Sequence, residues 1–122
     1  MKRLIAFFAL LIFAEPALAQ WEPPDEVLQV RVKGDGAWTV RCDYQDRRGT
    51  SENREAKGPK DGRLHLNRAT GGTCTYRAAP DEPLTIRLKS PLYQCTLPQP
   101  GEGCSQTFPA GASGQFEVRG RD

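Results

Sequence analysis

The sequence predicts an all-β protein, a small antiparallel β-sandwich or barrel of about seven strands that is stapled by two disulfides and preceded by a cleavable signal peptide. Short segments alternate between apolar and polar residues, as strands with one buried face do. After the leader, no window of about 11 residues keeps the i, i+3, i+4, i+7 apolar spacing of a helix. The chain of 122 residues is too short for more than one typical domain.

The first 19 residues have the layout of a secretory signal peptide. The chain starts with Met-Lys-Arg, residues 4–14 are all apolar, and the small residues of Ala-Leu-Ala precede Gln20. This apolar run is shorter than the ~18–20 residues of a membrane-spanning helix, which argues against an uncleaved anchor. We expect cleavage after Ala19, a periplasmic or secreted protein, and no membrane span in the mature part.

The mature part divides into a Pro-rich lead-in over residues 20–26 and a single domain over residues 27–122. The alternating segments of the domain are bounded by Gly, Pro, Asn or Asp, which favour turns. The expected strands cover residues 27–33, 37–44, 63–67, 73–77, 84–89, 92–97 and 115–119. Asp35-Gly36, between the first two, predicts a β-hairpin. Residues 45–62 predict a long polar loop, either mobile or used for recognition.

The four cysteines predict two disulfides. An even number of cysteines in a small exported domain is typical of a disulfide framework. Of the three pairings, we favour Cys42–Cys74 and Cys95–Cys104, because the second pair closes a short Pro/Gly-rich loop. The wide cysteine spacing and the single histidine argue against a zinc site. No metal or other cofactor is expected.

The sequence lacks the residue patterns of an enzyme active site. The single histidine, His65, lies between two leucines and is expected to point outward from a strand. Carboxylate pairs such as Asp81 and Glu82 are adjacent in the chain, whereas glycosidase chemistry needs two carboxyl groups that face each other across a cleft. We therefore expect no catalytic residues and no enzymatic activity.

Arginine is the one unusual charge feature, with 11 Arg against 4 Lys after the leader. The outward phase of the expected strands carries Arg31, Arg41, Arg63, Arg77, Arg87 and Arg119. Guanidinium groups suit the capture of phosphate, sulfate or carboxylate, so Arg31, Arg41, Arg77 and Arg87 predict an anion-binding face. The alternative is that these arginines pair with outward carboxylates such as Asp43 and Glu117. Because the net charge is nearly balanced, we expect no positive electrostatic field over the whole domain that would attract a polyanion.

These observations favour a non-enzymatic binding module of the bacterial periplasm or cell exterior. Its expected partner is another exported protein or an anionic component of the envelope, and Trp21 in the lead-in is a candidate contact residue. Export and the lack of an RNA-binding motif argue against nucleic acid. The alternatives are a small hydrolase that acts on envelope polysaccharide, and a structural accessory subunit of a secretion or surface assembly.

Overall fold

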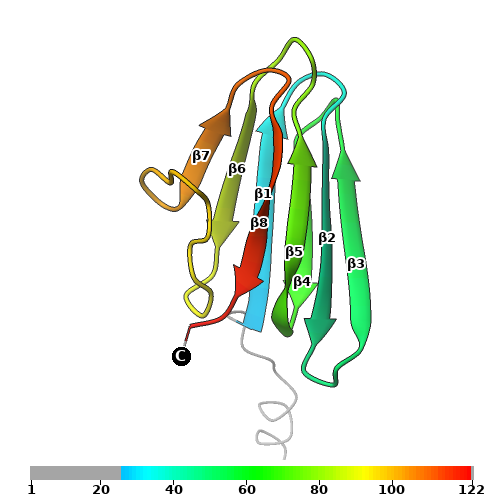
Figure 1. The fold of residues 1–122 in the computed structure, drawn as a ribbon, viewed down its shortest axis with the longest axis vertical. Helices are drawn as coiled ribbons and strands as arrows, with labels where there is room; N and C mark the ends of the chain where they lie inside the picture. The colour runs from blue at the N-terminus through cyan, green and yellow to red at the C-terminus, as the bar shows by residue number, and fades with distance from the viewer. Residues whose placement is uncertain (1–25, 122) are drawn as a thin grey trace, which may run out of the picture.

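A computed structural model describes residues 26–121 and contains eight β-strands and, over that range, no α-helix (Figure 1). The strands are β1 (Val27–Gly34), β2 (Thr39–Asp46), β3 (Ser51–Lys57), β4 (Gly62–Asn67), β5 (Ala69–Arg77), β6 (Leu84–Lys89), β7 (Ser105–Phe108) and β8 (Ser113–Arg119). They form two four-stranded antiparallel sheets, which confirms the all-β prediction with one strand more than expected. Sheet A has the order β4-β1-β6-β7, and sheet B has the order β3-β2-β5-β8. The leader and Trp21 lie outside the described residues.

One hydrophobic core lies between the two sheets. In β1, Leu28, Val30 and Val32 are buried, and they alternate with residues that face away from the core. The same alternation in β2 buries Val40 and Cys42 against them. Because buried side chains of both sheets belong to a single cluster, the fold is a two-layer sandwich with two outer faces. Over residues 26–121, no helix is long and apolar enough to cross a membrane.

The hairpin expected at Asp35-Gly36 is wrong. The chain does turn there, with Gly36 at φ 79°, but β1 pairs with β4 and β6, whereas β2 pairs with β3 and β5. The connection therefore crosses from sheet A to sheet B. Trp38 follows the crossing and is only 1% exposed, and its indole Nε1 donates a hydrogen bond to the carbonyl oxygen of Gly34 at 3.2 Å. A buried indole at this end of the sandwich packs between the two sheets.

Three segments differ from the expected strand pattern. Residues 45–62 contain the edge strand β3, and the Gly/Pro-rich connection over residues 98–114 contains the short strand β7. Residues 92–97 were expected to be a strand, but only Tyr93 makes a bridge, to Gly120. This segment instead runs beside the end of β8, where the backbone N–H of Gln94 donates to the carbonyl oxygen of Arg119 at 2.7 Å. It covers part of an edge that would otherwise expose unpaired backbone groups.

The structure contains the disulfides Cys42–Cys74 and Cys95–Cys104, the same pairs that the sequence favours. Cys42 and Cys74 are directly opposite each other on β2 and β5, and both are fully buried. Cys95 is exposed and Cys104 is half-buried, and their bond closes the connection between β6 and β7. Two disulfides are consistent with an oxidising location outside the cytoplasm.

Candidate anion-binding site

The strands of the two sheets differ sharply in charge. The strands of sheet A contain five cationic residues and no Asp or Glu. The cationic residues are Arg31, Lys33, Arg63, Arg87 and Lys89. The strands of sheet B contain five cationic and five acidic residues. They are Arg41, Arg54, Lys57, Arg77 and Arg119, with Asp43, Asp46, Glu52, Glu55 and Glu117. The small net charge of the chain therefore conceals one strongly basic sheet.

Three arginines of sheet A form a row across three neighbouring strands, which we call the arginine row. Arg31 on β1 is directly opposite Arg63 on β4 and directly opposite Arg87 on β6. Neighbouring strands lie about 4.8 Å apart, so the three side chains leave the sheet side by side. Like charges in directly opposite positions destabilise a sheet. Among residues 26–121, no carboxylate lies within 4.0 Å of any of the three guanidinium groups.

A shallow hollow of about 390 Å³ lies over the arginine row. Its lining includes all three arginines together with Lys33, Thr85 and Ser105. The one carboxylate in the lining belongs to Asp61, and its Oδ1 accepts a hydrogen bond from the backbone N–H of Gly34 at 3.2 Å. The Nε atom of Arg31 is buried and has no hydrogen-bond acceptor in the described part of the chain. The hollow therefore presents hydrogen-bond donors and positive charge to a ligand.

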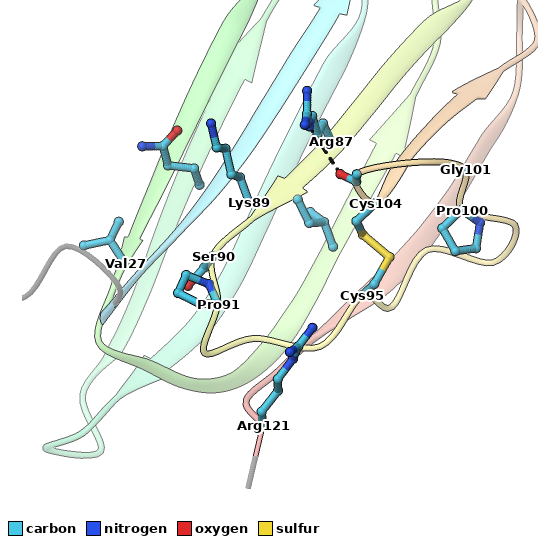
Figure 2. A pocket seen from close by; sticks show the side chains of 13 residues that line it. Val27, Arg87, Lys89, Ser90, Pro91, Cys95, Pro100, Gly101, Cys104 and Arg121 are labelled. Carbon is cyan, nitrogen blue, oxygen red and sulfur yellow. Dashed lines mark hydrogen bonds between the residues drawn. A yellow bond between two sulfur atoms is a disulfide. The ribbon is translucent and has the colours of Figure 1, made fainter.

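Arg87 also lines a second, larger groove of about 820 Å³ at the other end of β1 and β6 (Figure 2). One wall of this groove is the connection that follows β6, closed by Cys95–Cys104. The Nε of Arg87 donates a hydrogen bond to the carbonyl oxygen of Gly103 at 3.2 Å. Lys89 and Arg121 also line the groove, so its cations come from two strand positions and from the C-terminal segment.

Two of the four arginines predicted to share a face do not lie on it. Arg41 and Arg77 are on β2 and β5, so they face outward from sheet B, on the opposite side of the sandwich. Arg41 forms an ion pair with Asp43 at 3.1 Å, and the hydrogen bond in this pair raises the pKa of the Arg41 guanidinium. Arg119 is paired with Glu117 in the same way. Both alternatives that the sequence left open are therefore present. On sheet B, Arg41, Arg54 and Arg119 form ion pairs with carboxylates, whereas Arg77 and the three arginines of the arginine row form none among residues 26–121.

Lys33 lines the hollow over the arginine row and Lys89 lines the larger groove, and neither is among the residues that the sequence predicts for the site. The signal that could have found them is the lack of Asp and Glu in residues 27–34, 62–67 and 84–89.

His65 is exposed on the outer face of sheet A, opposite Gln29. Within the described residues, no three His, Cys, Asp or Glu side chains are grouped so that they could hold a metal ion. Comparison of the chain with protein-family models, curated proteins and solved structures gives no match.

Proposed function

We propose that the protein is an exported binding protein of the bacterial periplasm or cell exterior, and that the outer face of sheet A binds an anionic component of the envelope. The observation that carries this proposal is the arginine row, whose three guanidinium groups have no carboxylate partner among residues 26–121 and lie on a sheet whose strands contain no carboxylate. The signal-peptide pattern and the two disulfides support export.

The chemistry of the arginine row suits phosphate, sulfate or carboxylate. A guanidinium group donates hydrogen bonds in a planar fork that matches two oxygens of such an anion. An anion over Arg31 would be close to the side chains on both neighbouring strands. It would also relieve the repulsion among the three cations, so binding should stabilise the fold.

A hydrolase acting on envelope polysaccharide fits this geometry less well. Glycoside hydrolysis generally requires two carboxyl groups on opposite sides of the scissile bond. In the lining of the hollow over the arginine row, Asp61 is the single carboxylate, and one of its oxygens already accepts a backbone hydrogen bond. These features favour binding over catalysis.

Retention on an immobilised polyanion, heparin, tests the proposal. The double variant Arg31→Ala/Arg87→Ala removes two cations from sheet A, and Arg41→Ala/Arg77→Ala removes two cations from sheet B. Both variants change the net charge by the same amount, so they separate the basic face from overall charge. We expect the sheet A variant to elute at clearly lower salt and the sheet B variant to elute like the unmodified protein. Equal losses in the two variants would show that net charge alone governs retention, and the proposed face would be wrong.

A further inference from the structure

The two hollows on the outer face of sheet A form one track along β1 and β6. The smaller hollow lies at the Lys33 and Thr85 end, and the larger groove lies at the Val27 and Ser90 end. Arg87 lines both, so the two hollows are adjacent at this residue. Val27 and Lys33 are six residues apart on one strand, which corresponds to about 20 Å. A ligand that fills the whole track must therefore be extended.

Cations recur along this track at a regular interval. Outward residues of a strand repeat every second position, or about every 6.8 Å. The first outward row pairs Lys33 with Thr85, the second pairs Arg31 with Arg87, and the third pairs Gln29 with Lys89. Each row holds at least one cation, and Arg121 lies beyond the third row in the groove. A ligand with one anionic group would use one row, whereas a chain with repeated anionic groups would use them all.

The polar side chains of the track offer both donors and acceptors to a ligand. Arg31 lines the smaller hollow, and its guanidinium group is a hydrogen-bond donor. Gln29 lines the larger groove, and its amide group both donates and accepts. The two residues are neighbours on the outward side of β1, so these groups suit a ligand that carries anionic acceptors beside hydroxyl groups. Anionic groups next to hydroxyl groups are the chemistry of an acidic sugar.

The same face lacks the side chains that would insert into a lipid bilayer. Proteins that lie on a membrane bury exposed apolar side chains in it, in addition to electrostatic attraction. Over the described range, Leu92 is the one large hydrophobic residue that is exposed, at 41%, and it lines neither hollow. These observations favour a soluble or wall-bound polymer over a membrane surface.

We propose that the ligand is a linear acidic polysaccharide, with a carboxylate, sulfate or phosphate group on successive sugars, that lies along β1 and β6 across both hollows. This inference rests on the anion-binding function proposed above and adds the class and the orientation of the ligand. The arginine row binds the middle of the polymer segment, and Lys89 and Arg121 bind its end in the larger groove.

The test measures how affinity depends on ligand length. Calorimetric titration would use oligogalacturonates and heparin-derived oligosaccharides, each as a disaccharide and a hexasaccharide, with the full chain as purified. We expect the hexasaccharide of at least one series to bind about tenfold or more tightly than its disaccharide, because it reaches more cations. Lys89→Ala/Arg121→Ala should lower the affinity for the hexasaccharide far more than the affinity for the disaccharide, and so remove most of this gain. Lys57→Ala/Arg77→Ala, with the same change in charge on sheet B, should alter neither.

The possible failures are distinguishable. Equal affinity for short and long oligosaccharides, with loss of binding in Arg31→Ala/Arg87→Ala, would overturn the polymer proposal and leave anion binding in place. Binding to vesicles of phosphatidylglycerol, without binding to either oligosaccharide, would also overturn it and identify a membrane surface as the ligand. If Arg31→Ala/Arg87→Ala binds every probe as the unmodified protein does, the proposed function fails as well.

Discussion

Arg87 donates a hydrogen bond from its Nε to the carbonyl oxygen of Gly103, and the two atoms are 3.2 Å apart. Gly103 immediately precedes Cys104, whose disulfide to Cys95 closes the connection between β6 and β7. The carbonyl oxygen of Cys104 in turn accepts a hydrogen bond from the backbone N–H of Leu88, beside Arg87, at 3.0 Å. The disulfide-closed connection therefore holds one end of the arginine row in position.

Gly103→Ala should weaken polyanion binding. Gly103 has φ 69°, and a Cβ at this position would lie 2.7 Å from Nη2 of Arg87, so the guanidinium group must move. Gly49→Ala is a matched control, because Gly49 has φ 80° and nothing lies within 4 Å of its added Cβ. Both changes should cost about 1–2 kcal/mol of stability for a left-handed alanine, measured by urea unfolding. Only Gly103→Ala should lower the salt concentration of elution from heparin, and equal elution of the two variants would contradict the positioning role.

The two disulfides should have separable effects. In the chain-entropy model, loss of Cys42–Cys74 costs about 4 kcal/mol and loss of Cys95–Cys104 about 3 kcal/mol. Cys42→Ala/Cys74→Ala also leaves a defect in the core, so it should cause the larger drop in the urea midpoint. Cys95→Ala/Cys104→Ala should additionally weaken heparin binding, because the connection no longer fixes Gly103 against Arg87. Unchanged heparin binding in a folded Cys95→Ala/Cys104→Ala protein would show that Arg87 does not depend on this connection.

The sequence predicts which side chains face the core but not which strands are neighbours. Alternation places Leu28, Val30 and Val40 inward whether β1 and β2 share a sheet or lie in opposite sheets. For this reason the turn at Asp35-Gly36 suggested a hairpin. The cysteine pairing was predictable because loop length, a local property, favours one partner for Cys95.

β3 could not be predicted from alternation because both of its faces carry polar residues. It is an edge strand, and along Ser51–Lys57 the one apolar residue is Ala56. Glu52 and Arg54 lie on the side that faces the core layer, and charged residues in such positions discourage pairing with another chain. Backbone pairing with β2 defines this strand.

The sequence predicts which arginines of the candidate site face outward, but not which of them share a face. The outward phase of Arg31 and Arg87 follows from the sequence, as does that of Arg41 and Arg77. Assigning each pair to its own face requires the sheet order, which depends on contacts distant in sequence. Once β1, β4 and β6 are known to be neighbours, the lack of carboxylates in all three becomes meaningful.

Arg31→Glu should stabilise the unliganded protein while abolishing polyanion binding. The new carboxylate would be directly opposite Arg63 and Arg87, so two like-charge pairs become opposite-charge pairs. Each opposite-charge pair contributes up to about 1 kcal/mol in a sheet. Thermal unfolding at low salt should show a raised midpoint, and added salt should reduce the gain.

Arg41→Glu is the contrasting variant on sheet B. Arg41 is paired with Asp43 and is directly opposite Glu55, so the change replaces attraction with repulsion and should lower the midpoint. If Arg31→Glu lowered the midpoint at low salt and Arg41→Glu did not, the arginine row would not be a site of unrelieved repulsion.

Tyr93→Phe should destabilise the protein and change its response to alkaline pH. The Tyr93 hydroxyl donates a buried hydrogen bond to the carbonyl oxygen of Ala69 at 2.7 Å, which ties residues 92–97 to the start of β5. Loss of this bond should cost about 1 kcal/mol at neutral pH, measured by urea unfolding.

The pH effect has a definite sign. Burial raises the pKa of Tyr93 above its ordinary value of 10.0, and the charge of Arg47 acts in the opposite direction. Below pH 10 the tyrosine is neutral in both the folded and the unfolded chain, so its contribution to stability is complete. As pH rises above 10, the unfolded chain releases the proton first, and stability is lost through the folded-state pKa. Tyr93→Phe should therefore show a shallower loss of stability above pH 10 than the unmodified protein. Burial also raises the pKa of Tyr76, so part of the loss of stability at alkaline pH should remain in Tyr93→Phe. An unchanged slope in Tyr93→Phe would mean that Tyr93 has the same pKa in the folded and unfolded states.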